Sequence, residues 1–203
     1  MIIQPFDAST ITGFSTLIVG TRRMGKSTLV KDIMYHNRDK FDVGAGISKH
    51  GYEMSEYMPS KWVSETFDKD VVDNLMVEML DDIEKQGCFI MEGLDILKPA
   101  MQAKVMNTHL PNLTSVYTLH YLNISDRRAH IDYVFASRVS IVDQRKRLWK
   151  RFFTMFLDYE SFSEAYDECT KEPWGFMVAD TRTGAVFSYT ASPDTPPFQL
   201  AAV

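Results

Sequence analysis

The stretch Leu17-Ile18-Val19-Gly20-Thr21-Arg22-Arg23-Met24-Gly25-Lys26-Ser27-Thr28-Leu29-Val30 determines the fold that the sequence predicts. An apolar run leads into the pattern G-x-x-x-x-G-K-S and then into an amphipathic segment, which predicts a strand, a phosphate-binding loop and a helix. Gly20 permits a tight turn, and Gly25 lets the backbone approach the phosphates where a Cβ would obstruct it. Lys26 adds a positive charge near the β- and γ-phosphates, and the Ser27 hydroxyl can bind Mg²⁺. The nucleotide-binding residues predicted by this pattern are Gly20, Thr21, Arg22, Arg23, Met24, Gly25, Lys26, Ser27 and Thr28.

The composition is that of one globular domain. The chain has 203 residues, of which 45% are hydrophobic and 12% aromatic, enough to bury a sizeable core. We expect a single domain over residues 1–191 and a Pro-rich tail over 192–203 that is either disordered or a docking segment. The net charge of −5 argues against a generally basic nucleic-acid coat, so any contact with DNA requires a local basic patch.

Cysteine use and hydropathy indicate the compartment. Cys88 and Cys169 have no partner at zinc-binding spacing, and we expect both to be buried free thiols in a reducing compartment. The longest apolar runs are short, and residues 1–7 lack the basic start and long apolar core of a signal peptide. The sequence therefore predicts a soluble intracellular protein with no membrane partner.

Predicted strands and helices alternate along the chain. Apolar runs predict strands at 14–19, 41–48, 88–91, 113–119 and 132–138. Periodicity and start signals predict helices at 25–38, 71–83, 99–108, 143–156 and 160–170. The remaining expectations are an irregular arm or short edge strand at 1–13, a loop with at most a helical turn at 49–68, and a hairpin of 174–179 with 185–190. The predicted fold class is α/β: a three-layer P-loop NTPase sandwich with a mainly parallel central sheet and a C-terminal β-hairpin.

Polar residues follow two of the predicted strands. Glu92 comes directly after strand 88–91, where a P-loop hydrolase needs an acid for Mg²⁺, and Asp95 lies further along the same loop. Either carboxylate could position the attacking water, and the simpler alternative for each is an ordinary solvated carboxylate. We expect Glu92 to be held at a buried strand end and Asp95 to be screened by water. His120 ends strand 113–119, where it could sense the γ-phosphate or have only a structural role.

Basic residues gather in the C-terminal half of the chain. They could supply an arginine that stabilises charge on the γ-phosphate, or they could contact DNA phosphates. The simpler alternative is a solvated helix face over a core stripe of Leu148, Phe152 and Phe156, and we favour it for the lysines. The basic positions are Arg127, Arg128, Arg145, Lys146, Arg147, Lys150 and Arg151.

Beyond the P-loop, several segments resemble a known family in order and approximate spacing. These segments are Met106-Asn107-Thr108-His109, Thr118-Leu119-His120-Tyr121, Ala129-His130-Ile131-Asp132-Tyr133-Val134-Phe135, Asp167-Glu168-Cys169-Thr170 and Val186-Phe187-Ser188-Tyr189. Over nearly its whole length the chain resembles the genome-packaging ATPases of nucleocytoplasmic large DNA viruses, within the FtsK/HerA superfamily. It departs from the family pattern in having Gly93 after Glu92 in place of a second acid, Thr108-His109-Leu110 after Asn107 in place of Gly-Arg-His, and His120 in place of Gln.

The resemblance implies an ATP-hydrolysing subunit of a motor that moves double-stranded DNA into a preformed capsid. It implies a homo-oligomeric ring, pentameric or hexameric, with a capsid or portal protein as a further partner, in the host cytoplasm or in the virion. In such a motor Lys26 holds the phosphates of ATP, Ser27 and Glu92 hold Mg²⁺, Glu92 or Asp95 positions water, and His120 is the sensor.

The resemblance also implies an arginine that acts in the site of a neighbouring subunit. Arg128 and Arg145 match family arginines, and we favour Arg145 slightly. Two alternatives stay open for the function. One is a nucleotide-binding scaffold of the same fold that has lost hydrolysis, and the other is a small nucleotide kinase, for which Arg127 and Arg128 would form a lid.

Overall fold

The protein is built around one nine-stranded sheet. The structure, a computed structural model, describes residues 3–107, 110–122 and 131–200. Within these residues the strand order is β1-β9-β8-β7-β2-β6-β5-β3-β4, and the neighbouring strands are parallel except in the pairs β7–β8 and β8–β9. The strands are β1 (Gln4–Pro5), β2 (Ser15–Val19), β3 (Val43–Ile47), β4 (Val63–Ser64), β5 (Gly87–Met91), β6 (Leu113–Leu119), β7 (Tyr133–Ser137), β8 (Gly175–Asp180) and β9 (Val186–Thr190).

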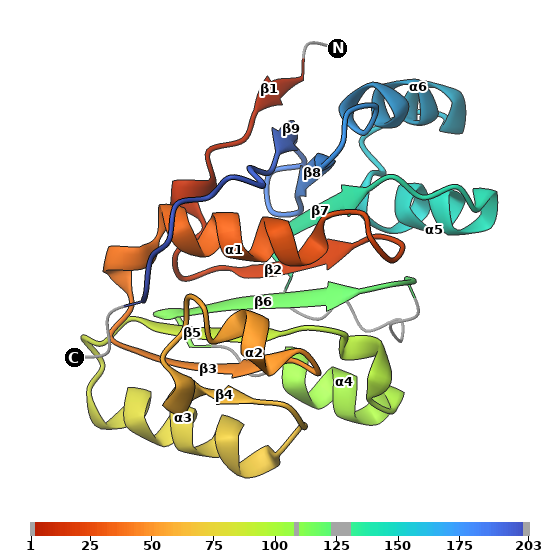
Figure 1. Ribbon diagram of the computed structural model, residues 1–203. Helices are drawn as coiled ribbons and strands as arrows, with labels where there is room; N and C mark the ends of the chain where they lie inside the picture. The colour runs from red at the N-terminus through yellow and green to blue at the C-terminus, as the bar shows by residue number, and fades with distance from the viewer. Residues whose placement is uncertain (1–2, 108–109, 123–130, 201–203) are drawn as a thin grey trace.

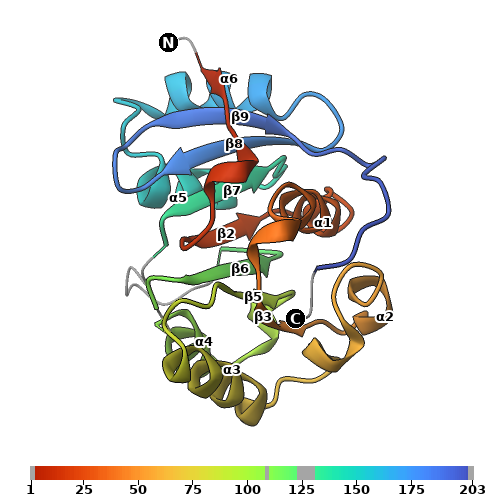
Figure 2. The same cartoon turned by 90° about the vertical axis from the view of Figure 1, so that its left-hand side faces the viewer.

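Helices cover both faces of this sheet, as Figures 1 and 2 show. One face packs against α1 and α2, and the other against α3, α4, α5 and α6. Along β2, Leu17 and Val19 enter one core while Ile18 enters the other, because successive side chains of a strand point to opposite faces. The helices are α1 (Lys26–His36), α2 (Gly51–Met54), α3 (Lys69–Asp81), α4 (Pro99–Met106), α5 (Val142–Phe152) and α6 (Tyr159–Cys169). The predicted α/β three-layer sandwich is confirmed.

Local sequence signals explain where the helices begin. The Asp68 and Asp158 carboxylates each accept a hydrogen bond from a backbone N–H of the first turn, at the start of α3 and α6. Pro99 occupies the first turn of α4, where its missing N–H is not needed. Short 3₁₀ turns join several elements: η1 (Ala8–Thr10), η2 (Arg38–Lys40), η3 (Ser60–Trp62) and η4 (Leu94–Ile96).

Several boundaries differ from those expected. Residues 49–68 contain a helical turn, α2, as the sequence allowed, but also a two-residue strand, β4, that pairs with β3 and was not expected. The helix expected to end at 156 stops at Phe152, since Phe153 leaves the helical region of backbone angles. Phe156 is buried as expected, but it reaches the core from the connection after α5.

The C-terminal tail lies against the domain, so the disordered alternative is wrong for residues 192–200. The carboxylate of Asp32, buried within α1, accepts a hydrogen bond from the Ser192 N–H at 3.2 Å. Further along, the Phe198 ring stacks on Tyr57, with 5.7 Å between the ring centroids. Figure 2 shows this segment running from the sheet along α1 toward α2. The tail therefore docks onto its own chain.

The sheet order decides which residues can meet. The parallel strands β2, β3, β5, β6 and β7 all end at one edge of the sheet, which we call the P-loop edge, and the antiparallel β8 begins there. The opposite edge, where β2 and β7 begin and the β8–β9 turn lies, we call the far edge. Because β6 lies between β2 and β5, residues after β6 lie between the P-loop and residues after β5. None of the helices in the described part of the chain is long and apolar enough to cross a bilayer.

Candidate functional site

The P-loop leaves β2 at Gly20 and closes at Gly25, the residue before α1. A Cβ on Gly20 would lie 1.8 Å from the Ser137 hydroxyl oxygen, so no side chain fits. Gly25 has a φ of +79°, a left-handed conformation that favours glycine, which explains why a glycine occupies this position in the turn. Arg23 also adopts a positive φ of 65°. The loop thus has the conformation that places backbone N–H groups and the α1 N-terminus beside an open cavity.

Lys26 reaches back over the loop. Its Nζ donates hydrogen bonds to the Gly20 carbonyl at 2.7 Å and to the Thr21 carbonyl at 2.9 Å, and only 8% of the residue is exposed. Burial lowers the pKa of Lys26 to about 8, although the charges of Asp95 and Glu92 act in the opposite direction. The neighbouring residues therefore compensate this cation incompletely, as expected of a group whose partner is a bound anion.

Glu92 follows β5 and is fixed in place by β3. Its backbone N–H donates to the Ile47 carbonyl at 2.9 Å, and its Oε2 accepts a hydrogen bond from the Ser48 hydroxyl at 2.7 Å. Ser48 is buried, and its oxygen also accepts from the His50 N–H. Glu92 thus lies at a buried strand end as predicted, with one carboxylate oxygen oriented by a serine that sequence analysis did not identify.

Asp95 is more buried, and closer to the other site residues, than its position in a loop suggested. The Asp95 Oδ2 lies 3.2 Å from Nδ1 of His120, and each side chain is about three-quarters buried. The Asp95 charge also raises the pKa of Lys26 more than the Glu92 charge does. The expectation that water screens Asp95 is therefore wrong. The reason is that η4 folds back against the end of β6, where the Gly93 N–H donates to the Thr118 hydroxyl at 2.9 Å.

These residues surround one cavity of about 640 Å³ at the P-loop edge. It is lined by nine of the residues selected from the sequence: Arg22, Arg23, Gly25, Lys26, Ser27, Thr28, Glu92, Asp95 and His120. Residues that line it but were given no role from the sequence include Ser48, Lys49, His50, Thr118 and Trp174. The Thr118 hydroxyl, near the end of β6, could have been anticipated from the T-L-H pattern, because alternate residues such as Thr118 and His120 share a face. Nothing in the local sequence pointed to Trp174.

The cavity fits a magnesium ion only in combination with a ligand. The Ser27 hydroxyl and the Glu92 carboxylate supply the oxygen donors that Mg²⁺ prefers. Among the described residues, no group of three His, Cys, Asp or Glu side chains could hold a metal by itself. Phosphate oxygens and water would therefore have to complete the coordination.

The predicted trans-acting arginines have a different outcome. Arg128 lies outside the described residues. Arg145 on α5 donates to Asp167 at 2.9 Å and to the Ser163 hydroxyl at 2.9 Å, and its guanidinium lies 5.1 Å from the Tyr166 ring centroid. These contacts attach α5 to α6 within one chain. These contacts do not support the choice of Arg145 over Arg128 as the trans-acting arginine. The role of Arg145 in a neighbouring subunit stays a prediction.

The two cysteines are free in the structure. Cys88 is fully buried and Cys169 is partly buried. Burial raises the pKa of the Cys88 thiol to about 12 and, with a smaller effect from the Glu168 charge, that of Cys169 to about 11. Both thiols are thus protonated near neutral pH and are poor nucleophiles.

Comparisons with known proteins agree on the fold. No protein-family model matches the chain. The uncharacterized protein 088R of Invertebrate iridescent virus 3 is 22% identical over 205 aligned positions, which span 88% of this chain and 76% of that protein.

Solved structures give the stronger similarity. The genome packaging NTPase B204 of Sulfolobus turreted icosahedral virus 2, in complex with AMPPCP, matches with a TM-score of 0.59 and 12% identity over 86% of this chain and 96% of that one. The pCW3 conjugation coupling protein TcpA, with ATPγS, matches with a TM-score of 0.60 and 10% identity over 89% of this chain and 60% of that one. At these identities the similarity defines the fold, which is that of the P-loop ATPases.

Proposed function

We propose that this chain is an Mg²⁺-dependent ATPase that drives double-stranded DNA into a viral capsid. The observation that carries the proposal is the cavity at the P-loop edge, where Lys26, Ser27 and Glu92 meet the Asp95–His120 pair. The fold similarity to B204, which is described as a genome packaging NTPase, supports the packaging role. The 22% identity to a protein of an iridescent virus supports a viral origin.

The residues divide the chemistry between them. The P-loop N–H groups and Lys26 would hold the phosphates of ATP, with Lys26 exchanging its two carbonyl partners for phosphate oxygens. Ser27 and Glu92 would hold Mg²⁺, which would neutralise part of the phosphate charge. The Ser48 hydroxyl keeps Glu92 oriented toward the cavity, so the carboxylate does not need to be ordered when the nucleotide binds.

The Asp95–His120 pair is suited to the water and the γ-phosphate. If Asp95 accepts a hydrogen bond from the Nδ1–H of neutral His120, the Nε2 atom is left as an acceptor for a water proton. Once protonated, His120 can instead donate to a phosphate oxygen, while Asp95 stabilises the positive charge. In this proposal Asp95 supplies the second carboxylate, because the position after Glu92 is occupied by Gly93 and not by an acid.

A ring would supply what a single chain lacks. A subunit with a net charge of −5 has little general attraction for DNA, but a pentameric or hexameric ring brings the basic residues of every subunit around one channel. The proposed partners are double-stranded DNA, further copies of this chain and a capsid or portal protein, at the assembly site in the host cytoplasm or in the virion. Because Arg145 is engaged within its own chain, we propose Arg128 as the arginine that completes a neighbour's site.

One alternative keeps a specific observation in its favour. Glu92 is followed by Gly93, so the adjacent acid typical of this position is missing, as in a nucleotide-binding scaffold without turnover. Retained Mg·ATP binding without phosphate release would identify that scaffold. No contact in the described residues favours the kinase alternative, whose proposed lid arginines, Arg127 and Arg128, lie outside them.

The deciding experiment measures phosphate release by the purified chain with and without double-stranded DNA. We expect Mg²⁺-dependent turnover that DNA stimulates, and loss of both ATP binding and turnover in Lys26→Ala, because the charge facing the phosphates is removed. Lys61→Ala is the matched control, since Lys61 is exposed and lies outside this cavity. Unchanged ATP affinity in Lys26→Ala would refute the site, and turnover that ignores DNA would refute the motor.

A further inference from the structure

Trp174 occupies an unusual position beside the P-loop. It precedes β8 and has a positive φ of 58°, a conformation that a bulky residue rarely adopts. Its carbonyl accepts a hydrogen bond from the Ala191 N–H at 3.0 Å, which helps to hold this conformation. The indole Cδ1 is so close to Gly25 that a Cβ there would lie 2.6 Å from it. Backbone strain of this kind gathers at functional sites, where it fixes a side chain in a required place.

The sheet order places Trp174 opposite the catalytic residues. Glu92 and Asp95 follow β5, and His120 follows β6, all on one side of β2. Trp174 enters the same cavity from β8, on the other side of β2. The P-loop lies between these two groups. The cavity thus has an ionisable end, with carboxylates and a histidine, and an aromatic end.

We propose that Trp174 stacks on the nucleobase of the bound nucleoside triphosphate. The inference rests on the proposed function and assigns the orientation of the ligand: the terminal phosphate faces Glu92 and Asp95, and the base faces Trp174. The residue is 41% exposed although it contacts Gly25, so part of its surface is free to cover a planar ring. Stacking on an aromatic face is tolerant of base identity, so the contact favours nucleotides over bare phosphates and does not select among bases.

The alternative is that Trp174 only supports the P-loop turn. Its contact with Gly25 would then matter for every ligand that binds the loop, with or without a base. The two roles therefore differ in their effect on inorganic tripolyphosphate, which carries the phosphates of ATP without the nucleoside.

The test measures the affinities of Mg·ATP and Mg·tripolyphosphate by titration calorimetry on the full chain. We expect Trp174→Ala to weaken ATP binding by about tenfold or more while tripolyphosphate affinity stays the same. Trp174→Phe should restore most of the loss, whereas Trp174→Leu, which keeps apolar bulk without a π face, should not. Thermal unfolding of each variant confirms that it is folded. ATP should also quench tryptophan fluorescence in the native chain but not in Trp174→Phe.

The outcomes separate this inference from the proposed function. Equal weakening of ATP and tripolyphosphate in Trp174→Ala would overturn base stacking and assign Trp174 to support of the loop. Unchanged affinity for both ligands would overturn any role in binding. If the native chain binds neither ligand, or Lys26→Ala binds both normally, the proposed nucleotide site itself fails.

Discussion

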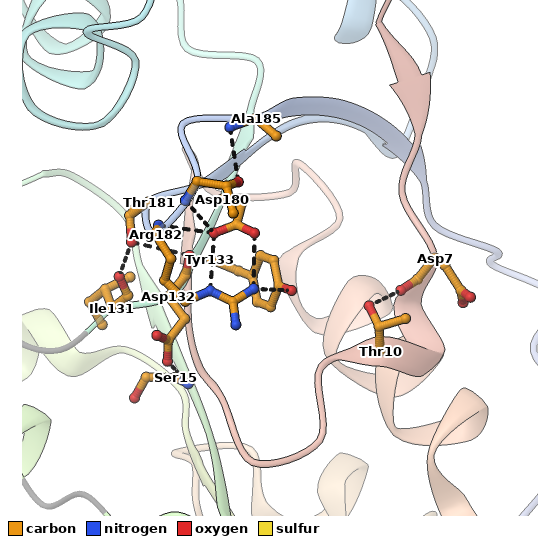
Figure 3. Close-up of polar contacts among 11 residues, drawn as sticks. Asp7, Thr10, Ser15, Ile131, Asp132, Tyr133, Asp180, Thr181, Arg182 and Ala185 are labelled. Carbon is orange, nitrogen blue, oxygen red and sulfur yellow. Dashed lines mark hydrogen bonds and ion pairs between the residues drawn. The ribbon is translucent and has the colours of Figure 1, made fainter.

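The two edges of the sheet both carry buried charges, but the charges are compensated differently. At the far edge, Asp180 accepts hydrogen bonds from the Arg182 guanidinium (Figure 3). The guanidinium carbon lies 3.9 Å from the centroid of the Phe14 ring and 4.7 Å from that of the Tyr133 ring. Burial opposes ionisation of Asp180, but these hydrogen bonds and the Arg182 charge outweigh it and lower the pKa of the carboxyl. The far edge is thus complete without a ligand.

At the P-loop edge the effect of burial on the pKa outweighs that of the neighbouring charges, the reverse of what is found at Asp180. Burial dominates at Lys26 and lowers its pKa to about 8, despite Asp95 and Glu92. The backbone is strained at Arg23 and Trp174, whereas the far edge has no non-glycine residue with positive φ among its described residues. The comparison teaches that a cluster with mutual partners stabilises the fold, while an incompletely compensated cation beside a strained loop is ready for an anion.

The largest expected effect concerns Arg128. The test asks which arginine acts in the site of a neighbouring subunit, a role that the comparison of the two edges does not assign. Arg145 lies near the P-loop edge but has internal partners like those of Arg182. We therefore expect Arg128→Ala to lower ATP turnover by about 10³-fold, since an arginine supplied in trans stabilises the transition-state charge. Mixing Arg128→Ala with Lys26→Ala subunits should restore activity, because some interfaces then combine an intact P-loop with an intact arginine.

Arg145→Ala is the matched variant for this experiment. Its loss should appear as a lower melting temperature, with no recovery of activity on mixing. If mixing rescues Arg145→Ala and not Arg128→Ala, Arg145 is the trans-acting residue, as the sequence first suggested. Turnover per subunit that is independent of protein concentration, with no rescue of either variant, would place the whole site within one chain.

The next effect separates the two carboxylates at the P-loop edge. Glu92→Gln should lower turnover by about 100-fold while Mg·ATP still binds, because an oriented charge is lost from the ionisable end of the cavity. Asp95→Asn should cost about tenfold, and His120→Gln the same, since the two side chains act as one pair. The measurement is single-turnover phosphate release by each variant.

The double variant Asp95→Asn with His120→Gln controls this assignment. Residues that act as a unit are not additive, so its turnover should match that of either single variant. Multiplied losses would show that Asp95 and His120 act separately. A larger loss from Asp95→Asn than from Glu92→Gln would exchange the roles of the two carboxylates.

Much of this architecture is predictable from local patterns. The P-loop, its helix and the buried strands have strong periodicity or fixed spacing, and the C-terminal ends of parallel strands must share an edge. The pairing of Asp95 with His120 and the contact of Trp174 with Gly25 arise from the order of strands in the sheet, which no local pattern contains. Likewise, the composition of the Pro-rich tail left disorder and docking both open, and only the contacts with Asp32 and Tyr57, far apart in the sequence, decide between them.

A smaller effect follows from the pKa of Lys26. ATP phosphates favour protonated Lys26, so Mg·ATP affinity should be steady below pH 8 and weaken by up to tenfold per pH unit above it. The measurement is calorimetric titration from pH 7 to about 9.5. Lys26→Arg is the control, because a guanidinium stays protonated over this range and should show no such slope. A slope of the same size in Lys26→Arg would assign the dependence to another group.

The same pKa has a consequence for the stability of the free protein. The folded-state pKa of Lys26 is lower than its unfolded value of 10.5, so the unfolded chain binds more protons between these values. The Lys26 contribution to the free energy of unfolding should therefore rise as pH increases from about 8 to 10.5. Saturating Mg·ATP should remove this dependence, because the bound phosphates stabilise the charged form.

The smallest effect tests the far edge. Arg182→Ala should lower the free energy of unfolding by about 1 kcal/mol, since the side chain is partly exposed and solvent screens its pairing with Asp180. ATP affinity and turnover should not change, because the far edge lies across the sheet from the P-loop. Arg182→Met separates the two contributions: it keeps an apolar chain near Phe14 and loses only the charge. If Arg182→Ala weakens ATP binding at constant stability, the two edges are coupled through β2 and β7, and the far edge contributes to function.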